Sequence, residues 1–180
     1  MDLRTKRTLR SLREAFYELR RELPLERVTV RALCERAEVG KATFYLHYHS
    51  VYDLSDRLQE QVVEDIVGGL DHPTRVLDDT TAFTGELFAS FVAHAEQIDL
   101  LFSGSQEHAL IEHVERALRK KIAAADPSLA EDRRFNILLT YQVHGSHAAY
   151  MRYAREGSEK DRAAVVDAIA QASAAVARLW

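Results

Sequence analysis

The chain has 180 residues with a net charge of −4; 47% of them are hydrophobic, and only seven are glycine and three proline. So few helix breakers, in a chain with enough apolar residues for a core, favour helices throughout. The single cysteine, Cys34, excludes an internal disulfide framework. No apolar segment follows the charged start and no apolar run approaches about 18 residues, so we expect a cytoplasmic protein with no signal peptide and no membrane partner.

The first expected helix carries an apolar stripe and ends before Pro24. The residue before a proline is pushed out of helical dihedral angles, which places the end of the helix there. The stripe repeats at helical spacing and consists of Leu9, Leu12, Phe16, Leu19 and Leu23.

Residues 29–54 predict two short helices joined by a tight turn and followed by a longer helix. Thr29 is a good N-cap for the first, Gly40 interrupts the pattern, and the second covers roughly residues 41–47. Ser50 begins a capping-box pattern that starts the longer helix.

The rest of the chain predicts more helices and shows no strand alternation. The expected ranges are about 51–67, 80–97, 98–104, 106–125, 130–156 and 159–180, with a loop over 71–79. We therefore expect an all-α protein of about nine helices. A three-helix helix-turn-helix domain, residues 1–50, would be continuous with a regulatory and dimerisation domain, residues 51–180.

The apolar spacing assigns the two sides of the helix-turn-helix. The expected core residues are Leu33, Ala37, Val39, Phe44 and Tyr48. The residues expected to project outward from the second short helix are Lys41, Ala42, Thr43, Tyr45 and His47. A cation, a methyl group and hydroxyl groups together suit a DNA major groove. The alternative is an ordinary corner of a helical bundle.

This segment resembles the N-terminal domain of the TetR/AcrR family of regulators. The matching positions are Thr29, Val30, Leu33, Ala37, Val39, Thr43, Phe44, Tyr45, His47, Tyr48, Ser50 and Leu54. The resemblance implies a cytoplasmic homodimer that binds a palindromic double-stranded operator. It also implies a repressor that a small-molecule effector releases by changing the separation of the two DNA-binding domains.

The resemblance also implies which side chains contact DNA. Thr43, flanked by Lys41 and Ala42, occupies the position that reaches base edges. The residues that it places at phosphates are Tyr45, His47 and Thr29, and Arg31 could reach a phosphate or a guanine.

The sequence departs from the family pattern at three positions. Glu38 replaces the usual glycine of the turn, which predicts a distorted turn or a positive φ at a non-glycine residue. Gly40 replaces a capping residue, and Val51 replaces a frequent phosphate-binding lysine. His49 or a basic N-terminal arm could compensate for that lysine, although the arm could equally be a disordered end. The arm consists of Arg4, Lys6 and Arg7.

Charge is divided unevenly along the chain. Residues 1–50 hold 11 lysines and arginines against 7 aspartates and glutamates, so they carry +4 and the remainder carries −8. A basic end on an acidic remainder is typical of a nucleic-acid face, and chance unevenness on a solvated surface is the alternative.

The second half offers weaker candidates, because apolar stripes are more often core than site. The candidates for an effector pocket are Phe88, Phe91, Phe102, Tyr141, His144 and His147. The last helix carries an apolar stripe that the resemblance makes a dimer interface: Val165, Ile169, Ala172, Val176 and Leu179. The alternative is that both of the last two helices only close the core of their own chain.

Other functions find little support in the sequence. The histidine pairs lack a metal-binding signature, the serines lack a nucleophile motif, and Cys34 fits a buried structural thiol. We therefore expect no metal, no cofactor and no enzymatic activity. A TetR-like module that binds a partner protein, with weak or no operator binding, is the second hypothesis, because Val51 removes one phosphate contact.

Overall fold

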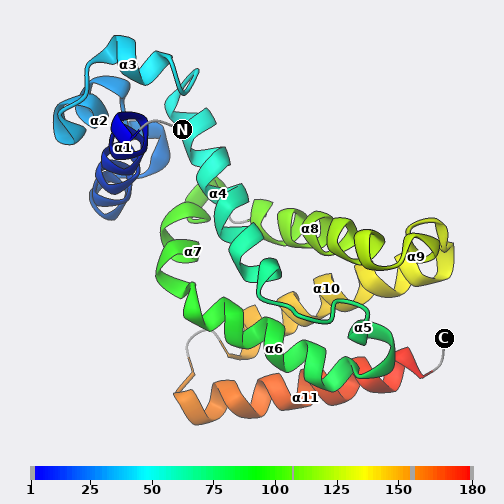
Figure 1. The fold of residues 1–180 in the computed structure, drawn as a ribbon. Coiled ribbons are helices and arrows are strands. Elements are labelled where there is room, and N and C mark those ends of the chain that lie inside the picture. The colour runs from blue at the N-terminus through cyan, green and yellow to red at the C-terminus, as the bar shows by residue number, and fades with distance from the viewer. Residues whose placement is uncertain (1–2, 107, 155–156, 179–180) are drawn as a thin grey trace. The chain divides into compact units, whose positions relative to one another are not determined.

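The computed structural model describes residues 3–106, 108–154 and 157–178. Over these ranges every element is helical, as the sequence predicts, and no strand is present. The structure has eleven α-helices within the described residues instead of about nine (Figure 1): α1 (Leu3–Glu22), α2 (Val30–Ala37), α3 (Lys41–Tyr45), α4 (Val51–Gly68), α5 (Arg75–Asp78), α6 (Thr80–Ala93), α7 (Ala95–Leu101), α8 (Ala109–Ala125), α9 (Pro127–Glu131), α10 (Arg133–Tyr153) and α11 (Glu159–Ala177).

The two additional helices are short and lie where the sequence suggested loops or boundaries. Helix α5 has four residues inside the expected 71–79 loop, and α9 has five residues after Asp126. Pro127 occupies the first turn of α9, where a missing N–H costs nothing, and the Asp126 carboxylate accepts from the Ser128 N–H at 3.0 Å. Local capping, which periodicity cannot reveal, therefore produces this helix.

The helices form two compact units. The first unit is Met1–Val62 with Glu96–Glu107, and the second is Val63–Ala95 with His108–Trp180. The expected boundary after residue 50 lies at the start of α4, whereas this division falls inside α4.

The first unit buries the predicted stripe of α1 and adds a segment from later in the chain. Leu12 and Phe16 are fully buried, and α1 packs beside α2. Gln59 of α4 is buried and donates to the Leu101 carbonyl at 3.0 Å, which ties residues 96–107 to this unit.

The second unit is a helical layer arrangement in which α11 lies along α6 and α10, and α8 lies beside α9 and α10 (Figure 1). Its buried residues include Val114, Leu118 and Ile122, one stripe of α8, and Leu138 and Leu139 of α10. Within the described residues, no helix has both the length and the hydropathy that crossing a membrane requires.

Candidate nucleic-acid interface

The turn between α2 and α3 adopts the second of the two backbones expected from the sequence, a positive φ at a non-glycine residue. Glu38 is the C-cap of α2 and adopts φ 54° and ψ 38°, the left-handed conformation. Its N–H donates to the carbonyls of Cys34 and Glu35, which closes the helix. An L-residue held there costs on the order of 1 kcal/mol or more, whereas glycine adopts this conformation freely.

Helix α3 is held by two aromatic side chains beneath it. Phe44 is fully buried and Tyr48 is 9% exposed, with their ring centroids 5.7 Å apart. Burial raises the pKa of the Tyr48 hydroxyl. The predicted core is confirmed for Phe44, Tyr48 and the buried Leu33 and Ala37, while Val39 is half-buried. A core on this side of a five-residue helix leaves the opposite side free.

The residues on the opposite side are those predicted to project outward. We call this set the α3 face: Lys41, Ala42, Thr43, Tyr45 and His47. Lys41 and Ala42 are exposed, the Tyr45 side chain is 56% exposed, and Thr43 and His47 are half-buried. Among the described residues, no hydrogen bond or ion pair occupies the Lys41 ammonium or the Tyr45 hydroxyl. The face therefore combines a cation, a methyl and two hydroxyls that remain available to a partner.

The start of α2 adds a hydroxyl and a guanidinium. The Thr29 oxygen accepts from the Ala32 N–H at 3.1 Å, and the hydroxyl can still donate its own proton. Arg31 forms an exposed ion pair with Glu35 at 2.8 Å. An exposed ion pair contributes little to stability, so Arg31 can exchange Glu35 for a phosphate.

Two arginines join elements of the first unit to one another, and neither was predicted from the sequence. Arg36 of α2 pairs with Glu22 at 2.8 Å and Glu18 at 3.6 Å, which joins α2 to α1. Arg20 is buried and donates to the Leu23 and Leu100 carbonyls and to the Ser103 hydroxyl, at 2.7 to 3.1 Å. Arg20 lies four residues after Phe16, on the buried side of α1. Two of its partners, Leu100 and Ser103, lie far along the chain, so the local sequence gives no sign of these contacts.

Two of the unusual positions lie at helix starts, since Gly40 precedes α3 and Val51 begins α4. Val51 is buried, so its side chain is not available to a phosphate. Gly40 caps α3 without a side-chain hydrogen bond. The predicted Ser50 cap is present, because the Asp53 N–H donates to the Ser50 hydroxyl at 3.1 Å. The Asp53 carboxylate accepts from the His49 N–H at 2.8 Å and not from the Ser50 N–H, so the reciprocal half of the predicted capping box is replaced by a bond one residue earlier.

The basic arm is part of a helix. Arg4, Lys6 and Arg7 lie in the first turns of α1, which begins at Leu3, and all three are exposed. The alternative of a disordered end is therefore wrong for these residues. His49 is also exposed and lies just before α4.

The six pocket candidates differ in burial and are divided between the two units. Phe88 is buried and stacks against Tyr150, with ring centroids 5.0 Å apart, and Phe91 is half-buried next to it. Phe102 belongs to the first unit, not the second. Of the three polar candidates, Tyr141 is 63% exposed, His144 is exposed and His147 is half-buried.

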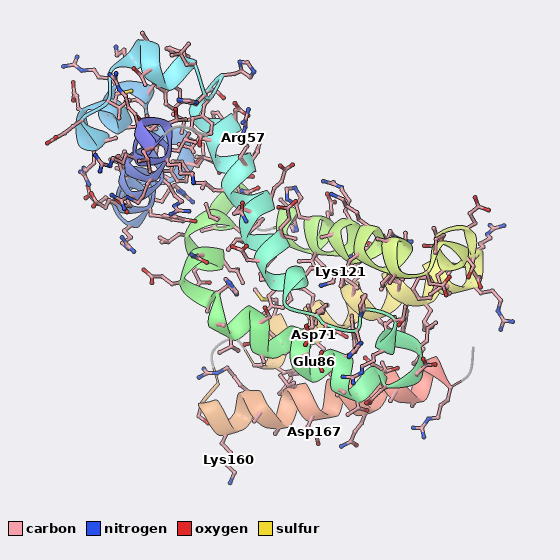
Figure 2. All side chains as sticks on the ribbon, viewed as in Figure 1. Arg57, Asp71, Glu86, Lys121, Lys160 and Asp167 are labelled. Carbon is pink, nitrogen blue, oxygen red and sulfur yellow. The ribbon has the colours of Figure 1, made fainter. Side chains whose placement is uncertain are left out.

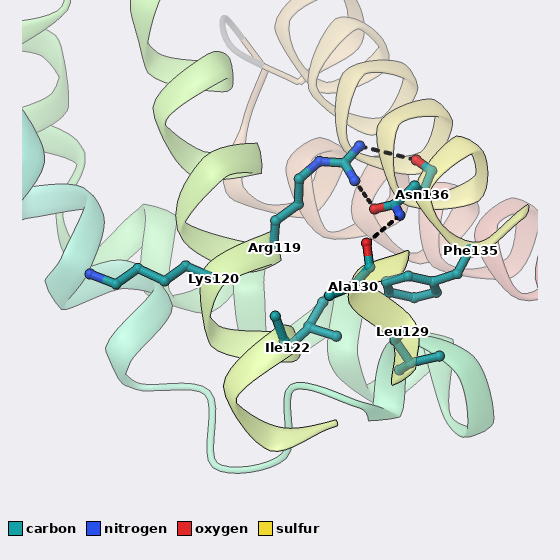
Figure 3. Close-up of a pocket in the computed structure, with 8 residues that line it drawn as sticks. Arg119, Lys120, Ile122, Leu129, Ala130, Phe135 and Asn136 are labelled. Carbon is teal, nitrogen blue, oxygen red and sulfur yellow. Dashed lines mark hydrogen bonds between the residues drawn. The ribbon is translucent and has the colours of Figure 1, made fainter. Parts of the chain in front are cut away.

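A pocket lies elsewhere in the second unit, between α8, α9 and α10. It has a volume of about 410 Å³ (Figure 3). Its lining residues, none of them predicted, are Arg119, Lys120, Ile122, Ala123, Leu129, Ala130, Phe135 and Asn136. The described residues contain no group of three His, Cys, Asp or Glu side chains placed to hold a metal ion.

The stripe predicted for dimerisation is partly used within the chain itself. Ile169 is buried, Val165 and Val176 are half-buried, Ala172 is exposed, and Leu179 lies outside the described residues. Helix α10 instead exposes a run of apolar side chains at helical spacing, with Ile137 50%, Tyr141 63% and Met151 37% exposed. We call these three the α10 stripe.

Comparisons with known proteins give a structural likeness but no sequence match. No protein-family model matches the chain, and no curated protein matches its sequence. A solved structure, the dihydroxyacetone kinase operon activator DhaS, superimposes with a TM-score of 0.47 at 12% sequence identity, covering 96% of this chain and 93% of that one. A likeness of this degree does not establish a common function.

Proposed function

We propose that the chain is a sequence-specific DNA-binding regulator of transcription of the TetR/AcrR type. The observation that carries the proposal is the α3 face, where Lys41, Thr43 and Tyr45 offer a cation and two hydroxyls while Phe44 holds the helix from below. A helix presenting such groups suits the major groove, whose base edges offer donors, acceptors and methyl groups.

Within that face, we assign two different roles. Lys41, Ala42 and Thr43 lie at the start of α3 and contact base edges, so they select sequence. Tyr45 and His47 contact phosphates and fix the position of the helix. Thr29 and Arg31 at the start of α2 add phosphate contacts beside them. Phosphate contacts supply affinity without sequence preference, which makes the two roles separable by experiment.

The proposed assembly is a homodimer that binds a palindromic operator. A two-fold axis would place the two copies of α3 in successive major grooves, roughly 34–36 Å apart. The α10 stripe supports this, because a run of exposed apolar side chains on one helix face marks a protein contact. The contact revises the sequence-based list, since it uses α10 and the exposed Ala172 of α11 in place of the buried Ile169.

We further propose that the protein represses transcription and that a small molecule in the second unit relieves the repression. Helix α4 begins next to α3 and ends within the second unit, so a displacement of its last turn is carried by a continuous helix toward α3. Ligand and DNA would then oppose each other with a coupling of about 1–3 kcal/mol, an ordinary value for allostery.

The test is to sequence the genomic DNA fragments that the purified protein enriches and to measure affinity for them against salt. We expect a shared palindrome and an affinity that falls steeply with salt, because several phosphates are neutralised on binding. Enrichment of random fragments, or no binding at low salt, would reject the proposal.

A second function is favoured by one observation. Val51 is buried, so the phosphate contact expected at the start of α4 is missing from its side chain. A module that binds a partner protein through the α10 stripe would need no operator. The same experiment separates the two, because such a module would enrich no DNA and would still self-associate or bind another protein.

A further inference from the structure

The pocket between α8, α9 and α10 has walls that are mainly hydrocarbon. Figure 3 shows Ile122 of α8, Leu129 of α9 and Phe135 of α10 around it. Ala123 and Ala130 contribute further apolar surface. A volume of about 410 Å³ lies within the range of small-molecule sites, roughly 300–1,000 Å³. The pocket therefore suits the body of a small apolar molecule.

The polar end of the pocket is held in place by its own hydrogen bonds. The Asn136 amide donates to the Ala130 carbonyl at 3.0 Å, and its oxygen accepts from Arg119 (Figure 3). The amide also donates to the Asp132 carbonyl at 2.9 Å. These bonds fix α9 against α10. The wall is thus formed before any ligand arrives, which lowers the entropic cost of binding.

Arg119 provides one donor beyond those that the protein uses. Its Nε and one terminal nitrogen donate to the Glu115 carboxylate at 3.0 and 2.6 Å, and that nitrogen also reaches Thr140 at 2.7 Å. The other terminal nitrogen donates to Asn136, which uses one of its two N–H groups. A ligand oxygen can accept from the remaining N–H. Glu115 already balances the charge, so the ligand needs an acceptor oxygen but no net charge.

The same turn of α8 also contacts the end of α4. Lys121, between pocket residues Lys120 and Ile122, donates to the Val67 carbonyl at 2.9 Å and the Gly68 carbonyl at 2.7 Å (Figure 2). These are among the last carbonyls of α4, which have no partner within the helix, and a cation there also interacts favourably with the helix dipole. A change in α8 at the pocket therefore acts directly on the last turn of α4.

We propose that the α8–α9–α10 pocket binds a small molecule with a hydrocarbon body and one acceptor oxygen, and that Lys121 transmits its occupancy to the end of α4. Binding and the change in α4 stand on these contacts alone. Only the further step, release of DNA, rests on the proposed function.

The first test is binding, measured by titration calorimetry with octanoate, with methyl octanoate as an uncharged acceptor and with acetate as a charge without a hydrocarbon body. We expect both octyl compounds to bind and acetate not to bind. Binding of only one octyl compound also supports the site and decides between a carboxylate and a neutral carbonyl. If neither octyl compound binds at millimolar concentration, or if acetate binds equally well, the proposal is wrong.

Variants locate the site. Ala123→Phe fills the pocket and should weaken octyl binding at least tenfold, whereas Ala124→Phe, one residue along and exposed, should not. Ala130→Leu fills the pocket from the exposed end of its wall and serves if Ala123→Phe fails to fold. Equal binding by a folded filling variant and by the Ala124→Phe control would place the ligand elsewhere and overturn the proposal.

The coupling is tested by amide hydrogen exchange at the end of α4, which does not depend on DNA. The Gly69 and Leu70 amides donate to the Asp65 and Val67 carbonyls, so their exchange reports the last turn. The better-binding octyl compound should change their exchange rates several-fold in the wild type. The effect should be lost in Lys121→Met, which keeps the pocket and should still bind. Unchanged exchange in the ligand-bound wild type, or an equal change in Lys121→Met, would reject the role of Lys121. If exchange responds but the enrichment experiment finds no operator, the proposed function fails while this inference stands.

Discussion

Two exposed surfaces of this molecule, the α3 face and the α10 stripe, differ in chemistry. The α3 face presents the Lys41 ammonium and the Tyr45 hydroxyl above a buried aromatic anchor, Phe44. The α10 stripe presents mainly Ile137 and Tyr141, which are 50% and 63% exposed and are largely hydrocarbon. Burying the α3 face lowers the free energy only when a partner supplies hydrogen bonds or phosphate charge. Burying the α10 stripe lowers the free energy without such groups, through the hydrophobic effect.

This difference determines what kind of partner each surface fits. A polyanion with a donor and acceptor pattern satisfies the α3 face, and an apolar surface such as a second copy of α10 satisfies the stripe. Substitutions on one surface should therefore leave the other function intact, except where dimerisation sets the spacing of the two α3 helices.

The largest effect is expected from placing charge on the α10 stripe. Ile137→Glu together with Tyr141→Glu should convert the dimer to a monomer, because two unpaired carboxylates would be buried in the contact. Operator affinity should fall by at least 100-fold, since a single α3 contacts only one half-site. Sedimentation velocity measures the first effect and a binding titration the second.

A matched control is Leu77→Glu, which adds charge at an exposed apolar residue of α5. It should remain dimeric and bind DNA normally. If the unmodified protein is a monomer at micromolar concentration, the α10 stripe is not a dimer contact.

The next effect concerns the two roles within the α3 face. Thr43→Val should change base preference at one operator position, with about 1–3 kcal/mol at stake for a lost base contact. Tyr45→Phe removes only a hydroxyl and should weaken binding to all sequences alike. Selection from random DNA gives preference, and titration against salt gives affinity. An unchanged preference when both Lys41 and Thr43 are substituted would remove them from the base-contacting set.

The first unit could be predicted from sequence because its signals are local. The 3.6-residue periodicity identified Leu33, Phe44 and Tyr48 as core. The absence of glycine from the turn left two expectations, a distorted turn or a positive φ, and Glu38 shows the second. Arg20 could not be predicted, since the Leu100 carbonyl that it binds lies 80 residues away in the chain.

The second unit was predicted less well because its apolar pattern runs nearly all round α10. Such a pattern gives the type of helix but not which side is covered, so Tyr141 was expected in a pocket and is exposed. Ile169 shows the reverse, since its stripe in α11 was assigned to a partner and it is buried within its own chain. The pocket beside Asn136 depends on α9, a five-residue helix that follows from one proline and its cap and not from periodicity.

A smaller effect should follow from relieving the backbone of the turn that positions α3. Glu38→Gly should raise the free energy of unfolding by about 1 kcal/mol, because glycine adopts φ 54° without a clash. Glu38→Asn should give part of that gain. Urea unfolding provides the measurement, and operator affinity should not fall, as the side chain lies outside the α3 face. The same replacement three residues earlier, Glu35→Gly, should instead lose about 1 kcal/mol, because it lies inside α2. A loss of stability in Glu38→Gly would mean that the turn is not strained.

The smallest effect is a pH dependence on the inner side of α10, next to the stripe. Burial lowers the pKa of His147, and repulsion from His144 lowers it further. The unfolded chain therefore binds a proton, near the ordinary histidine pKa of about 6.5, before the folded chain does. The stability that neutral His147 provides is complete above that pH and is lost as pH falls from about 6.5 toward the lowered folded value. We measure the free energy of unfolding in urea at several pH values. In His147→Gln this free energy should fall less steeply with decreasing pH than in the wild type, and the slopes should differ by about one proton or less. His72→Gln, at an exposed position, should keep the wild-type slope. Equal slopes in the wild type and in His147→Gln would show that His147 binds its proton alike in the folded and unfolded chain.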